Sequence, residues 1–416
     1  MGALWHPFAS MGLVDGHEFV IERGEGSCVY DTAGNRYVDA TASLWLTNVG
    51  YGRTEIADAV ADQMRHLHAY HVFADFATRP AMDLADRIAS LAPDPGSKVF
   101  LASGGSDAID TALKLARRYF DEIGQPQRTY FVVRDWAYHG MHASGTSLAG
   151  MEPNRARHGP LVEGIVKIPW DSIEALEAVV DEIGGDRIAG LFCEPVIGAG
   201  GVRPAPPGYL EKARRIVGDA GALFVADEVI TGFGRVGEWF ASTRFDLEPD
   251  LITFAKGVTS GYAPLGGVVV APRVAEPFWQ PGSDVMWRHG YTYSGHTAAC
   301  VAGLVNLDII EREHLVARAL DLEIVLEDAL DSLRAHPVVT EIRAGTGVLG
   351  GVQIDPELVS EDQGVTGRAA LAARDAGVIT RAIGGGGLQV SPPLVVTEAE
   401  IDEIVAGLRT GLDAVA

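Results

Sequence analysis

Lys256 is the residue whose surroundings disagree most with its own chemistry. It follows residues 251–255, "LITFA", which have the β-branched and aromatic bias of a buried strand. Burying an ammonium group without a partner is energetically unfavourable. The other lysines lie in charged segments predicted to be helical or beside short strands, where they can be solvated. A buried lysine has a lowered pKa, and its amine can form a Schiff base with an aldehyde. Lys256 is therefore the candidate nucleophile.

Carboxylates follow two further apolar runs. Asp227 and Glu228 close "ALFVADE", and Glu194 closes "AGLFCE". Ligands of an open α/β sheet bind beyond the carboxyl ends of its strands. A carboxylate pair there could bind a metal, form a structural ion pair, or hold a cationic atom of a cofactor. No cluster with metal-ligand spacing lies nearby, and "HLHAYH" (66–71) lacks the i, i+4 histidine pair. We therefore predict no metal site.

A glycine turn at 102–107, "ASGGSD", precedes a predicted helix over 107–118. Backbone N–H groups at such a turn, with the positive end of a helix dipole behind them, can hold a phosphate. Many helices begin in this way as a plain N-cap, so this pattern alone does not distinguish the two. Likewise Tyr138, in "DWAYHGMHASG" (135–145), could stack on a flat ring or simply pack in the core.

Together these features point to one ligand. Pyridoxal 5′-phosphate needs a lysine amine for its aldehyde and a carboxylate that keeps its ring nitrogen protonated. It also needs a helix N-terminus for its phosphate and an aromatic side chain over its ring. The "GAGG" of 198–201 leads into no helix, so a nicotinamide site is not expected there.

The sequence around these residues predicts the secondary structure that positions them. Strand-like and helical runs alternate over about two hundred residues, which indicates an α/β fold with a mostly parallel sheet covered on both faces. We predict a large cofactor-binding domain over 55–305 and a smaller α+β domain over 306–416. An N-terminal segment, 1–54, contains a hairpin at 28–40 and is expected to join the smaller domain. Residues 297–336 read as one long helical stretch.

Composition limits the class of protein. The 416 residues carry a formal net charge of −23, which argues against binding to nucleic acid or to anionic membrane surfaces. Three widely spaced cysteines, the lack of a signal-peptide pattern and the lack of a long apolar run indicate a cytoplasmic protein with reduced thiols.

In order and spacing, the motifs resemble those of the class III, or ω-type, aminotransferases of pyridoxal-phosphate fold type I. The resemblance rests on residues 224–241, "FVADEVITGFGRVGEWFA", and 249–268, "PDLITFAKGVTSGYAPLGGV". It also rests on the glycine turn, on "YHG" at 138–140 and on "HGYTYSGH" at 289–296. It implies a seven-stranded type of sheet and an enzyme that binds pyridoxal phosphate.

The resemblance also implies roles for single residues. Lys256 would bond to the cofactor aldehyde and move the substrate proton, Asp227 would pair with the ring nitrogen, and Glu194 would lie near it. The expected contacts of the ring and the phosphate are Gly105, Ser106, Tyr138, His139 and Val229, with Thr292 from a second subunit. This last contact implies a homodimer whose sites lie at the interface, with a tetramer left open.

For the substrate, the resemblance implies an arginine that pairs with the carboxylate of a keto acid and swings aside for an amine. Arg381 occupies that position, and four glycines follow it, which would give the loop freedom to move. Met141 and His142 stand where relatives acting on γ-aminobutyrate or ornithine have a second arginine. We expect Trp45, with Trp5 and Phe8, to line an apolar pocket beside Tyr138.

The predicted reaction is transfer of an amino group from a primary amine or ω-amino acid to a keto acid such as pyruvate, by a ping-pong mechanism through a Schiff base. The same residues would serve an aminomutase or decarboxylase, and the start "LWHPFASM" also resembles the diaminononanoate enzyme of biotin synthesis. A non-catalytic binding protein of this fold is the remaining alternative, although it would have no need of a buried amine. The sequence assigns no role to Arg288, no preferred amine and no stereochemistry.

Overall fold

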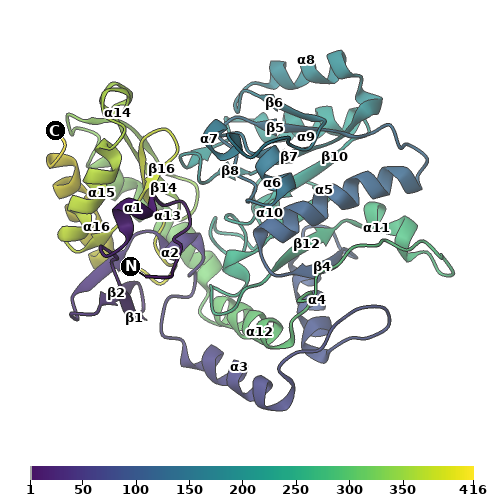
Figure 1. Cartoon of the computed structure of the whole chain (residues 1–416), viewed down its shortest axis with the longest axis horizontal. Coiled ribbons are helices and arrows are strands. Elements are labelled where there is room, and N and C mark those ends of the chain that lie inside the picture. The colour runs from purple at the N-terminus through teal and green to yellow at the C-terminus, as the bar shows by residue number, and fades with distance from the viewer. Residues whose placement is uncertain (1) are drawn as a thin grey trace.

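The computed structural model describes residues 2–416, and its largest element is a seven-stranded sheet (Figure 1). The strand order is β4-β12-β11-β10-β7-β5-β6. Their bounds are β4 Lys98–Ala102, β5 Tyr130–Arg134, β6 Ile165–Ile168, β7 Ile188–Cys193, β10 Leu223–Asp227, β11 Leu251–Phe254 and β12 Gly266–Val270. β12 runs antiparallel to both of its neighbours, and the other pairs formed by β5, β6, β7, β10 and β11 are parallel. The central strands β7, β10 and β11 are buried throughout, as expected for a sheet covered on both faces.

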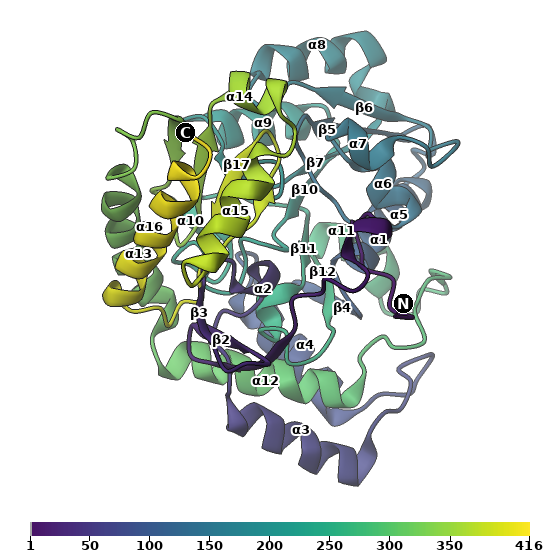
Figure 2. The ribbon, with the colours of Figure 1, turned by 60° about the vertical axis from the view of Figure 1, so that its left-hand side comes forward.

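Helices alternate with these strands along the chain. They are α3 Thr54–Leu67, α4 Arg79–Leu91, α5 Gly105–Glu122, α6 Ala143–Leu148, α7 Glu152–Arg155, α8 Ile173–Ile183, α9 Tyr209–Asp219, α10 Ala241–Arg244, α11 Pro272–Trp279 and α12 Thr297–Arg312. α5 packs on β11 and β12, and α12 packs against α3 and α4. α3 lies along α12 at the bottom of both views in Figures 1 and 2. A small hairpin, β8 Val196–Ile197 and β9 Arg203–Pro204, follows β7.

The C-terminal part forms a four-stranded antiparallel sheet, ordered β13-β14-β17-β16. Its strands are β13 Val339–Arg343, β14 Gly350–Ile354, β16 Ala382–Ile383 and β17 Gly387–Val390. Its helices are α13 Leu315–Asp331, α14 Pro356–Glu361, α15 Val365–Asp375 and α16 Glu398–Asp413. Figure 2 shows α13, α15 and α16 gathered on one side of the molecule.

The N-terminal hairpin is joined to the C-terminal part by a shared sheet. After the short helix α1 (Met11–Val14), the strands β1 (Ile21–Glu25), β2 (Cys28–Asp31) and β3 (Arg36–Asp39) pair in sequence. β15 (Val378–Ile379) then pairs parallel with β3. The short turn α2 (Ala42–Trp45) follows and carries the chain toward the large sheet.

The predicted helical stretch of 297–336 is two helices, α12 and α13, separated at His314. His314 has φ 53°, in the left-handed region, which redirects the chain between the large sheet and the C-terminal part. None of the helices within residues 2–416 combines the length and the apolar character needed to cross a bilayer.

Candidate active site

A cavity of about 380 Å³ lies where β7, β10 and β11 end and α5 begins. Eight of the residues predicted from the sequence line it together: Gly105, Ser106, Tyr138, His139, Glu194, Asp227, Val229 and Lys256. They come from segments far apart in the chain. The parallel strands bring them together because their carboxyl ends meet at one edge of the sheet.

Lys256 follows β11 and begins a tight 3-10 turn over Lys256–Val258. Its φ of 44° is unusual for a residue with a side chain, so its backbone conformation must be held by its surroundings. Asn306 of α12 donates its side-chain amide to the carbonyls of Gly257 and Val258, at 2.8 and 3.0 Å. Burial lowers the pKa of Lys256 to about 8, opposed by the charges of Asp227 and Glu194. A larger fraction of this amine is therefore neutral and nucleophilic at physiological pH than for an exposed lysine.

Both oxygens of the Asp227 carboxylate are held. Oδ1 accepts hydrogen bonds from the Thr253 hydroxyl at 3.0 Å and from the Val229 N–H at 3.1 Å. Oδ2 lies 2.7 Å from Nδ1 of His139, and both side chains are buried. Thr253 is the register partner of Asp227 on the neighbouring strand. This arrangement fixes the direction in which the carboxylate faces the cavity.

The adjacent carboxylate, Glu228, serves a different purpose. Its Oε1 accepts from the N–H and the hydroxyl of Ser242, at 2.9 and 2.6 Å, and its other oxygen accepts from Thr231 and from the Ala241 N–H. Glu228 is fully buried and binds the N-terminus of α10, away from the cavity. The two carboxylates therefore do not act as a pair. Asp227 lies in the cavity wall, and Glu228 is part of the surrounding fold.

Glu194 positions the loop that carries Tyr138. Its carboxylate accepts from the Tyr138 N–H at 3.0 Å and from the Gly198 N–H at 2.9 Å. Burial raises the pKa of Glu194, and the neighbouring His139 opposes this shift. Burial also raises the pKa of the Tyr138 phenol, which therefore stays protonated.

The N-terminus of α5 forms the other end of the cavity. The N–H groups of its first turn have no intrahelical partner, and a Cβ added at Gly104 would meet no atom within 4 Å, so the turn opens onto free space. The Ser106 hydroxyl accepts from the Met141 N–H at 3.1 Å, which leaves its own proton available to a ligand. Asp107 accepts from the Ser103 N–H at 3.0 Å and lies 2.8 Å from Nε2 of His142.

These residues fit pyridoxal phosphate. A buried amine with a lowered pKa, a fixed carboxylate and a helix N-terminus with free donors lie on the walls of one cavity. Among residues 2–416, Lys256 forms no ion pair, so its amine is available to an aldehyde. The donor set therefore matches the aldehyde, the ring nitrogen and the phosphate of this cofactor.

Three predicted site residues lie outside this cavity. Trp45 is buried in a cluster with Ile230, and the Arg381 guanidinium stacks on its ring at 4.4 Å from the centroid. Leu46, the residue after Trp45, lines the cavity, so the stacking on Trp45 places Arg381 near the site, and its charge lowers the pKa of Lys256. Thr292 is exposed at the surface of this single chain.

Two expectations about the substrate pocket are not met. Trp5 and Phe8 are 81% and 76% exposed and lie outside the cavity. The glycines after Arg381 do not form a free loop. Gly384 donates its N–H to Ala199 at 2.9 Å, and a Cβ there would lie 2.9 Å from Cα of Gly200. Glycine is required because two backbones from different parts of the chain touch.

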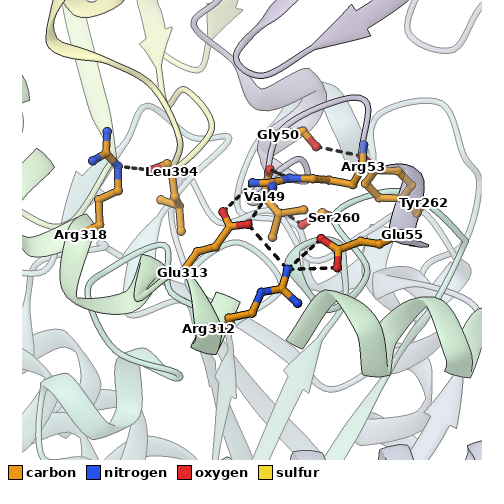
Figure 3. A network of polar contacts seen from close by, with 10 residues as sticks. All are labelled: Val49, Gly50, Arg53, Glu55, Ser260, Tyr262, Arg312, Glu313, Arg318 and Leu394. Carbon is orange, nitrogen blue, oxygen red and sulfur yellow. Dashed lines mark hydrogen bonds and ion pairs between the residues drawn. The ribbon is translucent and has the colours of Figure 1, made fainter. Parts of the chain in front are cut away.

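A polar network fixes the loop that follows Lys256 (Figure 3). The Ser260 hydroxyl accepts from the Val49 N–H at 3.2 Å, and the Tyr262 hydroxyl accepts from the Arg53 N–H at 2.7 Å. The Arg53 guanidinium makes two bonds of 2.7 Å to the Glu313 carboxylate, at the junction of α12 and α13. The network therefore ties the lysine loop to the point where the C-terminal part begins.

Comparisons with known proteins identify the family of this chain. The class III aminotransferase family matches residues 13–412. A probable aminotransferase of Mycobacterium tuberculosis is 37% identical over 98% of this chain and 92% of its own length. Putrescine–pyruvate aminotransferase of Pseudomonas aeruginosa is 36% identical over 95% of this chain and 91% of its own.

Solved structures give the same result. A transaminase from the marine bacterium Virgibacillus superposes with a TM-score of 0.94 at 34% identity, covering 99% of this chain and 97% of that one. An amine transaminase from an uncultivated Pseudomonas species, in its pyridoxal-phosphate-bound form, gives 0.93 at 34% identity, with coverage of 100% and 99%. The predicted fold class and cofactor are confirmed.

Proposed function

The chain belongs to the class III aminotransferases, which use pyridoxal phosphate, and we propose that it moves the amino group of a primary amine or ω-amino acid to a keto acid such as pyruvate. The observation that carries this substrate class is Arg381, a cation beside the site that has no carboxylate partner within residues 2–416. One such guanidinium suits one substrate carboxylate. A relative that acts on putrescine and pyruvate supports the same pair of substrates.

We assign the roles of the site residues as follows. The Lys256 amine, whose pKa is lowered by burial, takes the proton from the substrate carbon that bears the nitrogen and returns it. Asp227, fixed by His139 and Thr253, keeps a negative charge at the place where a ring nitrogen must stay protonated. Bound pyridoxal phosphate supplies the aldehyde that accepts the amino group and the ring that withdraws electrons.

The remaining contacts orient that group. Gly105 and Ser106 line the cavity and would present donors to the phosphate, and Tyr138 and Val229 would contact the ring. Glu194 holds the backbone of Tyr138 in place, and His139 holds Asp227. The absence of an arginine at Met141 and His142 argues against a second carboxylate clamp, so a carboxylate-free amine end can enter beside Tyr138.

We further propose that the protein acts as a cytoplasmic homodimer. Large apolar side chains are exposed on two neighbouring segments: Tyr70, Phe73 and Phe76 on one, and Met286 and Tyr293 on the other. Gly290 lies against the ring of Phe73, so the two segments adjoin. A second copy that covers them would bring Thr292 of one chain to the phosphate of the other, and such patches commonly mark protein interfaces.

The test uses the absorbance of the loaded enzyme. Adding single amines without a keto acid should bleach the near-visible band for each true donor, and pyruvate should restore it. The relatives are named as aminotransferases, which favours transfer over isomerisation or decarboxylation. A protein whose band no primary amine or ω-amino acid bleaches would contradict the proposed substrate class.

A further inference from the structure

Arg381 is held in place by Gln389, a residue that the known chemistry of the site does not involve. The Nε–H of Arg381 donates to Oε1 of Gln389 at 2.8 Å, while its guanidinium stacks on Trp45. No aspartate or glutamate within residues 2–416 forms an ion pair with Arg381. The cation therefore rests on a neutral acceptor and an aromatic face.

The Gln389 side chain is fixed at both ends. It is fully buried in β17, and its Nε2 donates to the Thr41 carbonyl at 3.2 Å. A carbonyl can only accept, so the amide nitrogen must face Thr41 and the amide oxygen must face Arg381. The backbone adds to this, because the Gln389 N–H donates to the Arg381 carbonyl at 3.0 Å and the Gln389 carbonyl accepts from Thr380 at 2.7 Å.

The backbone next to Arg381 is also fixed. The bond from Gly384 to Ala199 and the close approach to Gly200 tie the following turn to the turn of the β8–β9 hairpin. Any movement of the guanidinium between a carboxylate-binding and a withdrawn position must then come from rotation of the Arg381 side chain. Such a rotation breaks the bond to Gln389.

We propose that Gln389 is a positioning residue that holds Arg381 on Trp45 when the substrate has no carboxylate and releases it to one that does. A neutral amide oxygen accepts one hydrogen bond, whereas a carboxylate binds a guanidinium with charge and with two bonds, so the carboxylate displaces the amide. The strength of this acceptor sets the balance between keto acids and carboxylate-free amines. The inference rests on the proposed role of Arg381 as the carboxylate-binding group.

Two variants change this acceptor in opposite directions. Gln389→Glu gives Arg381 a charged partner that a substrate cannot easily displace, so the KM for pyruvate should rise at least about 10-fold with little change in kcat. Gln389→Met keeps the size but removes the acceptor, so the KM for pyruvate should fall about 3-fold, and that for a carboxylate-free amine should rise. The two half-reactions are followed separately by absorbance.

A binding measurement accompanies the kinetics. Propionate carries the carboxylate but cannot accept an amino group, and its binding is followed by tryptophan fluorescence, since the Trp45 ring touches the cation. Gln389→Glu should weaken propionate at least about 10-fold, and Gln389→Met should tighten it. Circular dichroism and melting temperature show that each variant folds.

Gln125 provides the matched control. Its side-chain oxygen accepts from Nε of Arg128 at 2.6 Å, and the Arg128 guanidinium lies over the Phe120 ring, so the pair repeats the contacts of Gln389 and Arg381 outside the cavity. Gln125→Glu and Gln125→Met should leave the ratio of the two KM values unchanged. Equal shifts of both half-reactions in the Gln389 variants would mean a merely structural role and would overturn the proposal.

Arg381→Leu separates this inference from the proposed function. If it leaves the KM for pyruvate unchanged, the carboxylate role of Arg381 is wrong. If it raises that KM while Gln389→Glu does not, only the role of Gln389 is wrong. Once Arg381 is removed, the Gln389 substitutions should have no further effect on pyruvate or propionate.

Discussion

Nδ1 of His139 lies 2.7 Å from Oδ2 of Asp227 in the wall of the cavity, with both side chains buried. The contact fixes one carboxylate oxygen, and Thr253 with the Val229 N–H fixes the other. We predict that Asp227→Asn, which keeps the shape and removes the charge, lowers kcat at least about 100-fold without unfolding the protein. Steady-state kinetics and circular dichroism check the two parts.

The neighbouring carboxylate is the control for that prediction. Glu228→Gln removes an equally buried charge one residue away, but its partners are Ser242, Thr231 and the start of α10. It should lower the melting temperature and leave kcat within about 3-fold of the wild-type value. A similar loss of kcat in both variants would contradict the special role of Asp227.

We expect the buried Lys256 to lower the free energy of unfolding of the cofactor-free protein near pH 7. Its pKa is about 8 in the folded chain, against an ordinary value of 10.5, so the folded state binds the proton less well than the unfolded state. We predict that Lys256→Met abolishes transamination and raises the free energy of unfolding by up to about 3 kcal/mol, an upper limit from the pKa difference.

The effect depends on pH in a defined direction. Between about pH 8 and pH 10.5 the unfolded chain binds more protons at this lysine than the folded chain, so wild-type stability rises with pH there. The advantage of Lys256→Met should therefore be full below pH 8 and shrink above it. Urea unfolding near pH 7 and near pH 10 measures this. Lys212→Met, at an exposed lysine, should show no such dependence.

The ion pair of Arg53 and Glu313 in Figure 3 is a further target, because it connects the lysine loop to the C-terminal part. The two side chains are 24% and 31% exposed, and the contact has two bonds. We predict that Arg53→Met lowers the free energy of unfolding by about 1–3 kcal/mol, since Glu313 loses both short bonds and keeps only a 3.8 Å contact with Arg312. Thermal unfolding of the loaded enzyme measures the change.

A solvated pair provides the comparison. Arg65 and Asp62 are 73% and 77% exposed, so Arg65→Met should change stability by less than about 0.5 kcal/mol. Equal effects of Arg53→Met and Arg65→Met would show that the network does not support the loop.

The residues of the site differ in how far their positions could be predicted from the sequence. Lys256, Asp227 and Glu194 each follow an apolar strand, and the carboxyl ends of parallel strands meet, so their proximity could be inferred. The fold class and the cofactor, inferred with the help of the family resemblance, are confirmed. The domain limits and the roles of single site residues stay predictions.

Other features depend on contacts between distant segments, which a single sequence does not reveal. The bonds from Asn306 to the turn after Lys256 and from Gln389 to Arg381 join residues whose types alone predict nothing. A threonine in a strand, such as Thr253, is equally common without a carboxylate partner. The glycines after Arg381 suggested a mobile loop, whereas Gly384 packs closely on Gly200. The sequence does not distinguish the two, because the lack of a side chain allows both mobility and close packing.

The last prediction tests whether two chains share a site. If Thr292 of one chain completes the phosphate contacts of the other, Lys256→Ala and Thr292→Asp should each inactivate a homodimer, the second because a carboxylate repels phosphate. A mixed dimer of the two variants would then contain one site with both its own Lys256 and the partner's intact Thr292. Mixing after reversible dissociation should restore activity, up to half that of a wild-type dimer for each mixed dimer, or about a quarter for a sample in which equal amounts of the two variants pair at random. If Thr292 acted within its own chain, every site in the mixed dimer would lack one group and no activity would return. Refolding each variant alone controls for damage during the exchange, and light scattering with sizing confirms that dimers are present in every sample.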